Sequence, residues 1–312
     1  MNRLAEPYPS RTRRSSRRIA SVGLGCLLAS VYASLIVMSS AQSLDMQSQL
    51  SVIDYYTDGE GALESIFDLV KDNNSMVVLY KILPFLPPDY LVRTSYGLIA
   101  FLWALFLLRQ LPITTALIFL ISTFVVCLNT NRQLLALIIA YYAISSPLVT
   151  KSLATIAAFS VHNTAVVPYL IKHITLPKTL LAVSIIAYVA LNFDLTFLKY
   201  GYSTNSSTIQ RNLLPSILIL FVVSFAVDGY RGVYKGILLF LLFSVIFYVL
   251  VAKLNFNQFI YTSRVAWVVL IALVVLRSQK FFSIRSGNYY LANISLLIFG
   301  AYHNYVLVRD WV

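Results

Sequence analysis

The chain has 312 residues, of which 59% are apolar and only 12% charged, and its mean hydropathy is +0.77. A water-facing surface needs more charge than this, so the composition excludes an ordinary soluble domain and predicts an all-α, polytopic integral membrane protein. The net charge is +12, but the basic residues cluster within 11–18 or stand singly between apolar runs. The positive-inside rule expects this distribution of cytoplasmic loops, and we therefore expect no nucleic-acid partner.

Residues 1–18 are expected to form a basic cytoplasmic tail, and residues 19–312 a single transmembrane domain. The first apolar run, Ile19 to Ser40, is longer than the apolar region of a signal peptide, which is roughly 7–15 residues. We interpret it as an uncleaved first helix, which leaves the N-terminus in the cytoplasm.

A long polar stretch follows at residues 41–91 and holds eight of the twelve acidic residues. After a cytoplasmic N-terminus, such an acidic stretch is expected to be an outer, periplasmic loop. Within it, Gly61 to Tyr80 shows helical spacing of apolar residues, which predicts a helix lying along the membrane surface.

A membrane helix needs about 20 apolar residues, and on this measure the chain holds about 9–11 such helices. The further predicted spans lie near 94–108, 112–128, 133–149, 179–197, 212–227, 236–252, 260–276 and 289–307. Residues 152–171 leave two alternatives open. A full crossing puts the later basic residues outside, whereas a re-entrant segment, turning near His162 and Asn163, keeps them in the cytoplasm. The positive-inside rule favours the re-entrant segment.

Two ionisable residues lie within this apolar pattern. Arg132 opens one apolar segment in Asn129-Thr-Asn-Arg132-Gln133, and His162 lies in the next, in Phe159-Ser-Val-His162-Asn163. An ionisable side chain at membrane depth costs free energy, so the pair predicts a site. The alternatives are a histidine that hydrogen-bonds a neighbouring helix and an arginine that anchors a helix at the interface.

The same stretch, residues 129–171, resembles the EpsG family of Wzy-type polysaccharide polymerases. That family has an Arg-Gln before a helix of small apolar residues, then Phe-His about thirty positions later; here His162 follows Phe159 by three residues. Asp54-Tyr55-Tyr56 resembles the acidic and aromatic stretch in its first outer loop. Arg264, after Tyr261-Thr-Ser, resembles its late arginine.

The resemblance implies a GT-C-like glycosyltransferase that joins oligosaccharide repeat units carried on undecaprenyl pyrophosphate, at the outer face of the bacterial inner membrane. Membrane lipids, a chain-length regulator and a flippase are the partners it implies. Guanidinium groups can grip the departing pyrophosphate through paired hydrogen bonds, and a histidine can take the acceptor proton. The expected catalytic residues are His162, Arg132 and Arg264. The expected substrate-binding residues are Arg211, Gln133, Asn163, Asp54, Tyr55 and Tyr56.

Several motifs are absent from the sequence: a Gly-rich phosphate loop, a His-Glu-x-x-His and an Asp-x-Asp pair. We therefore expect no metal, no cofactor and no nucleotide-sugar donor. Two other functions remain open. A lipid-glycan flippase or other secondary transporter also buries charge between helices, and a membrane acyltransferase also uses an intramembrane histidine.

Overall fold

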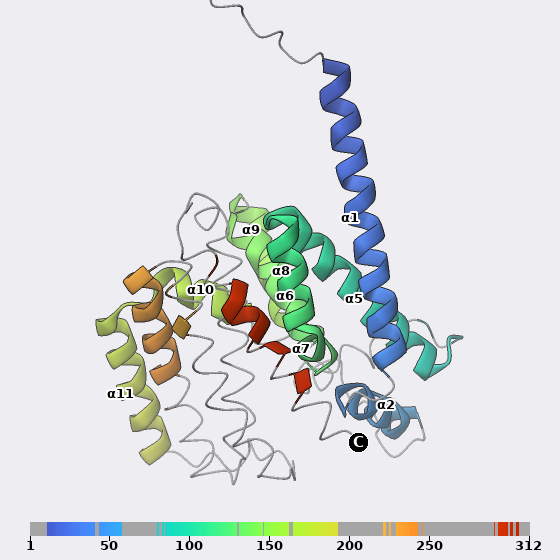
Figure 1. Cartoon of the computed structure of the whole chain (residues 1–312). Coiled ribbons are helices and arrows are strands. Elements are labelled where there is room, and N and C mark those ends of the chain that lie inside the picture. The colour runs from blue at the N-terminus through green and yellow to red at the C-terminus, as the bar shows by residue number, and fades with distance from the viewer. Residues whose placement is uncertain are drawn as a thin grey trace, which may run out of the picture.

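The computed structural model describes residues 11–40, 44–57, 80, 83, 85–129, 131–145, 147–161, 165–192, 221–222, 225, 229–242, 245, 290, 293–298, 300–301 and 304–305. All regular structure within these ranges is helical. The expected all-α class is confirmed for this part of the chain (Figure 1).

Two helices are long and apolar enough to cross a membrane, judged by length and composition. They are the run Val22–Ser40 within α1 (Arg11–Ser40) and the whole of α5 (Pro88–Gln110). Half of the apolar window of α5 is buried by other parts of the protein, against 17% of that of α1. Figure 1 shows α5 running into the helical bundle while α1 lies along its outside and projects beyond it. The core therefore forms around α5, whose Trp103 and Tyr96 are fully buried.

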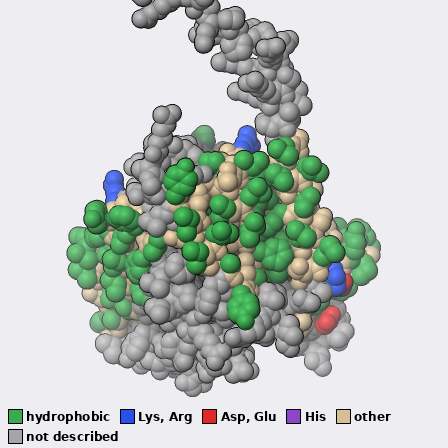
Figure 2. All heavy atoms as spheres, viewed as in Figure 1, with side chains coloured by type: hydrophobic (Ala, Val, Ile, Leu, Met, Phe, Trp, Pro, Cys, Tyr) green, Lys and Arg blue, Asp and Glu red, His purple; other side chains and the backbone are tan. Residues whose placement is uncertain are grey.

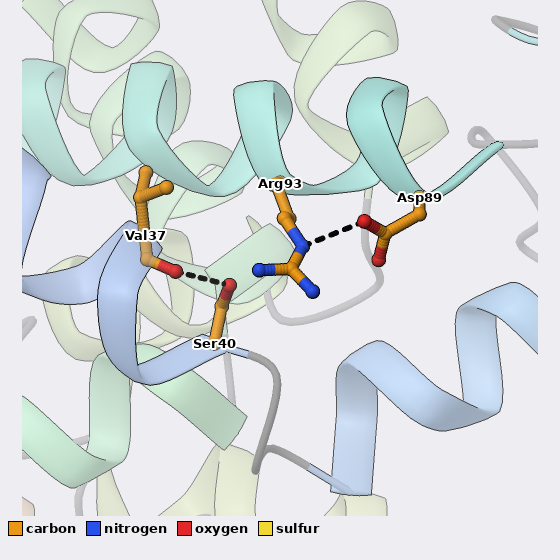
Figure 3. Close-up of polar contacts among 4 residues, drawn as sticks. All are labelled: Val37, Ser40, Asp89 and Arg93. Carbon is orange, nitrogen blue, oxygen red and sulfur yellow. Dashed lines mark hydrogen bonds and ion pairs between the residues drawn. The ribbon is translucent and has the colours of Figure 1, made fainter. Parts of the chain in front are cut away.

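Helix α5 begins at Pro88, earlier than the predicted start near 94. Proline suits the first helical turn because its missing N–H would have no partner there, and Asp89 in that turn suits the helix dipole. Arg93 pairs with Asp89 one turn later, with 2.8 Å between Nε and Oδ2. Figure 3 shows the Arg93 guanidinium between Asp89 and the end of α1, where the Ser40 hydroxyl donates to the Val37 carbonyl.

Part of the predicted outer loop is a helix, α2 (Leu44–Thr57), that packs against α5 and α7. Met46, Gln49 and Ile53 lie on one face of α2 and are buried there. The polar composition of residues 41–91 hid this helix. The surface helix expected over Gly61 to Tyr80 lies outside the described residues, apart from Tyr80 itself.

The predicted span 112–128 is present as two helices, α6 (Ile113–Ser122) and α7 (Phe124–Asn129), with an interruption at Thr123. The next two helices are α8 (Asn131–Ser145) and α9 (Leu148–Val161). They form an antiparallel hairpin around Ala136, Ala140 and Ala158, which are all fully buried. Small side chains at this interface let the two backbones approach closely.

The chain reverses again between α9 and α10 (Val166–His173). The hydroxyls of Thr155 and Tyr169 lie 2.6 Å apart, and the rings of Phe159 and Tyr169 stack with centroids 6.5 Å apart. In one continuous helix, residues 155 and 169 would be separated by about 21 Å along the axis. The chain therefore folds back after α9 and brings Tyr169 beside Thr155 and Phe159, while α10 packs mainly against α8. Helix α11 (Leu176–Asn192) starts just after α10.

Two later pieces of the chain return to these helices. Residues 229–242 are helical, and the Lys235 ammonium donates to the Ile171 carbonyl at 2.6 Å. Residues 293–298 are helical too, and the Ser122 hydroxyl donates to the Leu296 carbonyl at 2.7 Å. The piece 293–298 falls within the predicted span 289–307, whereas the piece 229–242 starts seven residues before the predicted span 236–252 and overlaps it from residue 236 on. Of the span 212–227 only three residues are described, all helical, and 260–276 lies outside the described part.

The basic residues gather at one end of the bundle. Helices α5 and α8 run parallel, because Asn131 in the first turn of α8 contacts Tyr96 in the third turn of α5, and Tyr141 further along α8 contacts Gln110 at the end of α5. It follows from this direction and from the two reversals that the end of α5, the start of α9 and the junction of α10 and α11 share one end of the bundle. That end holds Arg109, Lys151, Lys172 and Lys178, whereas Arg132, Asp89 and Arg93 belong to the other.

Large apolar side chains cover much of the outside. Val22 and Met38 on α1, Val149 and Leu153 on α9, and Leu181 on α11 are all more than 60% exposed. Figure 2 shows hydrophobic side chains over most of the described part of the face drawn, with Lys and Arg at its edges. Contiguous apolar surface of this extent is costly in water, and it suits association with a membrane.

Candidate functional site

A buried polar cluster lies where α2, α5 and α8 meet, and we define it as Gln49, Tyr96 and Asn131. The Gln49 amide donates to the Tyr96 hydroxyl at 3.3 Å, and the Asn131 amide donates to the Tyr96 carbonyl at 3.4 Å. The exposed fractions are 5% for Gln49, 0% for Tyr96 and 1% for Asn131. Polar groups this deeply buried need partners, and the tyrosine supplies one to each of two other helices.

Two acceptor oxygens beside this cluster stay unpaired within the described structure. They are Asn131 Oδ1 and Gln133 Oε1, both shielded from solvent and both in the first turn of α8. A buried acceptor without a donor costs about 1–3 kcal/mol. Native proteins keep such groups rarely, and a ligand that brings hydroxyl or amide donors would satisfy them.

Arg132 stands between these two residues at the N-terminal end of α8 and is half-buried. The first turn of a helix presents backbone N–H groups and the positive end of the helix dipole, so it attracts anions. The guanidinium adds a full positive charge with donors in a planar fork that matches phosphate oxygens. This end of α8 therefore combines an anion-attracting feature with unpaired acceptors for hydroxyl groups.

The C-terminal end of α9 lies beside the N-terminal end of α8. Ala136 and Ala158 belong to one buried cluster, and α8 and α9 run antiparallel. Arg132 precedes Ala136 by about one turn, and Val161 follows Ala158 by about one turn. Val161, which ends α9, therefore lies close to the level of Arg132 along the bundle.

The other expected site residues are only partly placed. Asp54 lies on the exposed side of α2, off the face that holds Gln49 and Ile53. Tyr55 and Tyr56 belong to the last turn of α2, where the structure describes the backbone alone. Four expected residues lie outside the described part of the chain: His162, Asn163, Arg211 and Arg264. Of the three expected catalytic residues, the described part of the chain contains Arg132, with Gln133 beside it in the first turn of α8.

Sequence reasoning missed Gln49, Tyr96 and Asn131 as members of a site. Asn131 adjoins Arg132 in the sequence and could have been selected as a polar residue opening an apolar helix. Nothing in the sequence signals that Gln49 and Tyr96, which are 47 positions apart, share a hydrogen bond.

Among the residues that the structure describes, no group of three His, Cys, Asp or Glu side chains is placed to hold a metal ion. Comparison of the chain with known family models, with curated proteins and with solved structures found no match. Functional assignment therefore depends on the chemistry of the chain itself.

Proposed function

We propose that the chain is a polytopic membrane glycosyltransferase of the Wzy type, which joins lipid-pyrophosphate-linked oligosaccharide units outside the cytoplasmic membrane. The observation that carries this proposal is the first turn of α8. There, Arg132 is flanked by the buried, unpaired amide oxygens of Asn131 and Gln133. A glycan pyrophosphate can bind both kinds of group at once, because its phosphates can accept from the guanidinium and its sugar hydroxyls can donate to the two amide oxygens.

The proposed reaction needs one anion site and one base. An acceptor hydroxyl attacks the anomeric carbon of the donor sugar, the bond from that carbon to the pyrophosphate oxygen breaks, and lipid pyrophosphate leaves. Arg132, with Arg264 and Arg211 as further candidates, stabilises the negative charge that grows on the leaving group. His162, which directly follows Val161 in the sequence, takes the proton of the hydroxyl.

The proposed topology has a cytoplasmic N-terminus and a re-entrant segment over α9 and α10. Its support is the chain reversal marked by the contact of Thr155 with Tyr169, together with the gathering of Arg109, Lys151 and Lys172 at one end of the bundle. A re-entrant segment keeps these cations on the cytoplasmic side, as the positive-inside rule requires. Arg132 then faces the outside, where the lipid-linked substrates are joined.

The test of the anion site is Arg132→Lys. An ammonium keeps the charge but cannot make two parallel hydrogen bonds to a phosphate, so most polymer should be lost. Arg109→Lys, at the opposite end of the bundle, is the matched control and should make polymer of normal length. Normal polymer from Arg132→Lys at unchanged protein level would mean that Arg132 only anchors the helix.

The test of the base is His162→Gln. Glutamine keeps a hydrogen-bonding group but cannot accept the proton, so turnover should fall by about 10²–10⁴-fold while the protein still inserts. Single repeat units should then reach the cell surface without being joined. Full-length polymer from this variant would refute a catalytic role for His162.

A secondary transporter of lipid-linked glycan is the second candidate. The observation in its favour is the interruption at Thr123, which gives the described helices a second discontinuity besides the reversal after Val161. Transporters commonly place paired broken helices around their substrate. The two candidates differ in what a loss-of-function variant accumulates: unjoined repeat units outside for a polymerase, and lipid-linked units inside for a transporter.

A further inference from the structure

A second charged surface lies at the other end of the bundle, where α10 meets α11. The helical segment 229–242 packs there, since the Lys235 ammonium donates to the Ile171 carbonyl at 2.6 Å and the Leu176 N–H donates to the Tyr234 hydroxyl at 3.2 Å. The Lys178 ammonium donates to the His173 carbonyl at 3.3 Å. These contacts hold two distant pieces of chain together around a single surface.

Three exposed cations lie on this surface, namely Lys172, Lys178 and Arg231, and a fourth cation, Lys235, is buried beside them. Arg231 lies three and four residues before Tyr234 and Lys235, so it shares their face of the segment. Lys172, Lys178 and Arg231 are exposed, whereas Lys235 is buried. Neither 165–192 nor 229–242 contains an acidic residue, so the described surface carries a concentrated positive charge. The nearest acid in the sequence, Asp228, lies outside the described residues.

The cations continue into an apolar stripe along α11. Lys178, Leu181, Ile185 and Tyr188 are spaced by three or four residues and lie on one face of that helix. Leu181, Ile185 and Tyr188 are 62%, 54% and 63% exposed. A positive group at the head of an exposed apolar stripe matches a molecule with an anionic head and a hydrocarbon tail.

We propose that the surface formed by Lys172, Lys178 and Arg231, with the stripe of Leu181, Ile185 and Tyr188 below it, binds an anionic phospholipid of the bilayer. The headgroup phosphate lies among the three exposed cations, and an acyl chain lies along α11. Buried Lys235 joins the 229–242 segment to the end of α10 and so fixes the position of Arg231. This proposal requires that the chain lies in a lipid bilayer, but it does not depend on the proposed polymerase activity.

The test measures the association of spin-labelled phosphatidylglycerol and spin-labelled phosphatidylcholine with the full chain in liposomes. The wild type should prefer phosphatidylglycerol. Lys178→Gln/Arg231→Gln should reduce its association by up to about 30-fold, since each cation near a membrane surface strengthens the attraction roughly five- to sixfold and the two factors multiply. Phosphatidylcholine association should stay unchanged.

Arg109→Gln/Lys151→Gln is the charge-matched control, because it removes two cations from the same end of the bundle but outside this surface. It should keep the preference for phosphatidylglycerol. An equal loss in the control, or equal association of both lipids with the wild type, would overturn the proposal. Lys178→Arg/Arg231→Lys keeps both charges and should bind phosphatidylglycerol normally. A loss confined to the glutamine variant would then come from the missing charges and not from misfolding.

Inorganic phosphate separates a lipid site from a site for a free anion. At matched ionic strength, phosphate should displace spin-labelled phosphatidylglycerol no better than chloride does, because the apolar stripe contributes only to lipid binding. Full displacement by millimolar phosphate would assign the surface to a soluble anion and overturn the lipid proposal.

Discussion

Asn131 is the residue at which stability and function are expected to conflict. It is 1% exposed, and its amide oxygen has no donor within the described structure. Such an arrangement costs folding free energy and persists in a protein when the group serves another purpose. Under the proposed function, this oxygen would accept a hydrogen bond from a hydroxyl of the substrate.

Asn131→Val tests this conflict. The substitution removes the unpaired acceptor together with one long hydrogen bond, so the free energy of unfolding should stay within about 1 kcal/mol of the wild type or rise. Polymer formation should nevertheless fall strongly. Thermal unfolding in detergent and polymer length in cells are the two measurements. A variant that is stable and fully active would show that Asn131 serves packing alone.

Gly97 shows how closely α1 approaches α5. A Cβ atom at position 97 would lie 2.7 Å from Val37 Cγ2, which is too close for two carbon atoms. Valine has little rotational freedom in a helix, so its methyl group cannot swing away freely. Gly97→Ala should therefore destabilise the protein by about 1–3 kcal/mol, the usual range for an overpacked interface.

The partner variant for Gly97→Ala is Val37→Ala, which removes the clashing methyl group. The double variant should recover most of the lost stability in thermal unfolding. Gly25→Ala is the control within α1, because nothing lies within 4 Å of a Cβ atom built there. Additive losses in the double variant would mean that α1 does not pack on α5 at this point.

At the scale of whole elements, Asn304 explains why α6 and α7 are separate helices. Its amide nitrogen donates to the Ile121 carbonyl at 2.8 Å, and its amide oxygen accepts from the Val125 N–H at 3.4 Å. In a continuous helix these two backbone groups would bond to each other. The asparagine side chain inserts into the helix ladder, which is a recognised cause of a kink.

Asn304→Leu should let Val125 and Ile121 pair directly and straighten the helix. The backbone groups remain satisfied, so stability should change by no more than about 1 kcal/mol. The start of α8 follows α7 closely, so Arg132 should shift and polymer formation should fall. Asn304→Asp, which faces the Ile121 carbonyl with an acceptor, should instead lose stability. Normal activity of Asn304→Leu would show that the kink is not needed to position Arg132.

The sequence predicted the long elements and missed those that depend on contacts. The apolar runs of α1 and α5 were readable because length and hydropathy decide a membrane-length helix. Helix α2 cannot be recognised in this way, because its face of Met46, Gln49 and Ile53 is surrounded by polar residues in the sequence. That face becomes buried only when α2 packs against other helices. The kink at Thr123 was equally hidden, because the residue that causes it lies 183 positions from Ile121.

The candidate site likewise contains residues that the sequence predicts and residues that it does not. Arg132 is predicted because an arginine that opens an apolar helix can be recognised from the sequence, and Gln133 because it completes the Arg-Gln pair of the family that this stretch resembles. Tyr96 was not, because its role is to connect Gln49 with Asn131, and both connections join residues far apart in the chain. Burial creates the unpaired oxygens, and burial of a particular polar atom cannot be read from composition.

At the scale of the whole molecule, the distribution of charge and the chain reversals give one prediction about orientation. Tyr90, which is 60% exposed, lies in the first turn of α5 at the end that holds Arg132. Lys151 and Lys178 lie at the opposite end. A re-entrant α9 and α10 predicts that Lys178 is cytoplasmic, together with Lys151, whereas a full crossing over 152–171 would place it outside with Tyr90.

Single cysteines at positions 90, 151 and 178 test this orientation in a background of Cys26→Ala and Cys127→Ser. Serine at 127 keeps an acceptor for the Tyr32 hydroxyl, which contacts the native sulfur at 3.0 Å. An impermeant thiol reagent added to intact cells should label position 90 and spare 151 and 178 until the membrane is opened. The same pattern should extend to position 264 outside and position 280 inside. Labelling of 178 together with 90 in intact cells would mean that the chain crosses fully after α9, and Arg231 and Lys280 would then face outward as well.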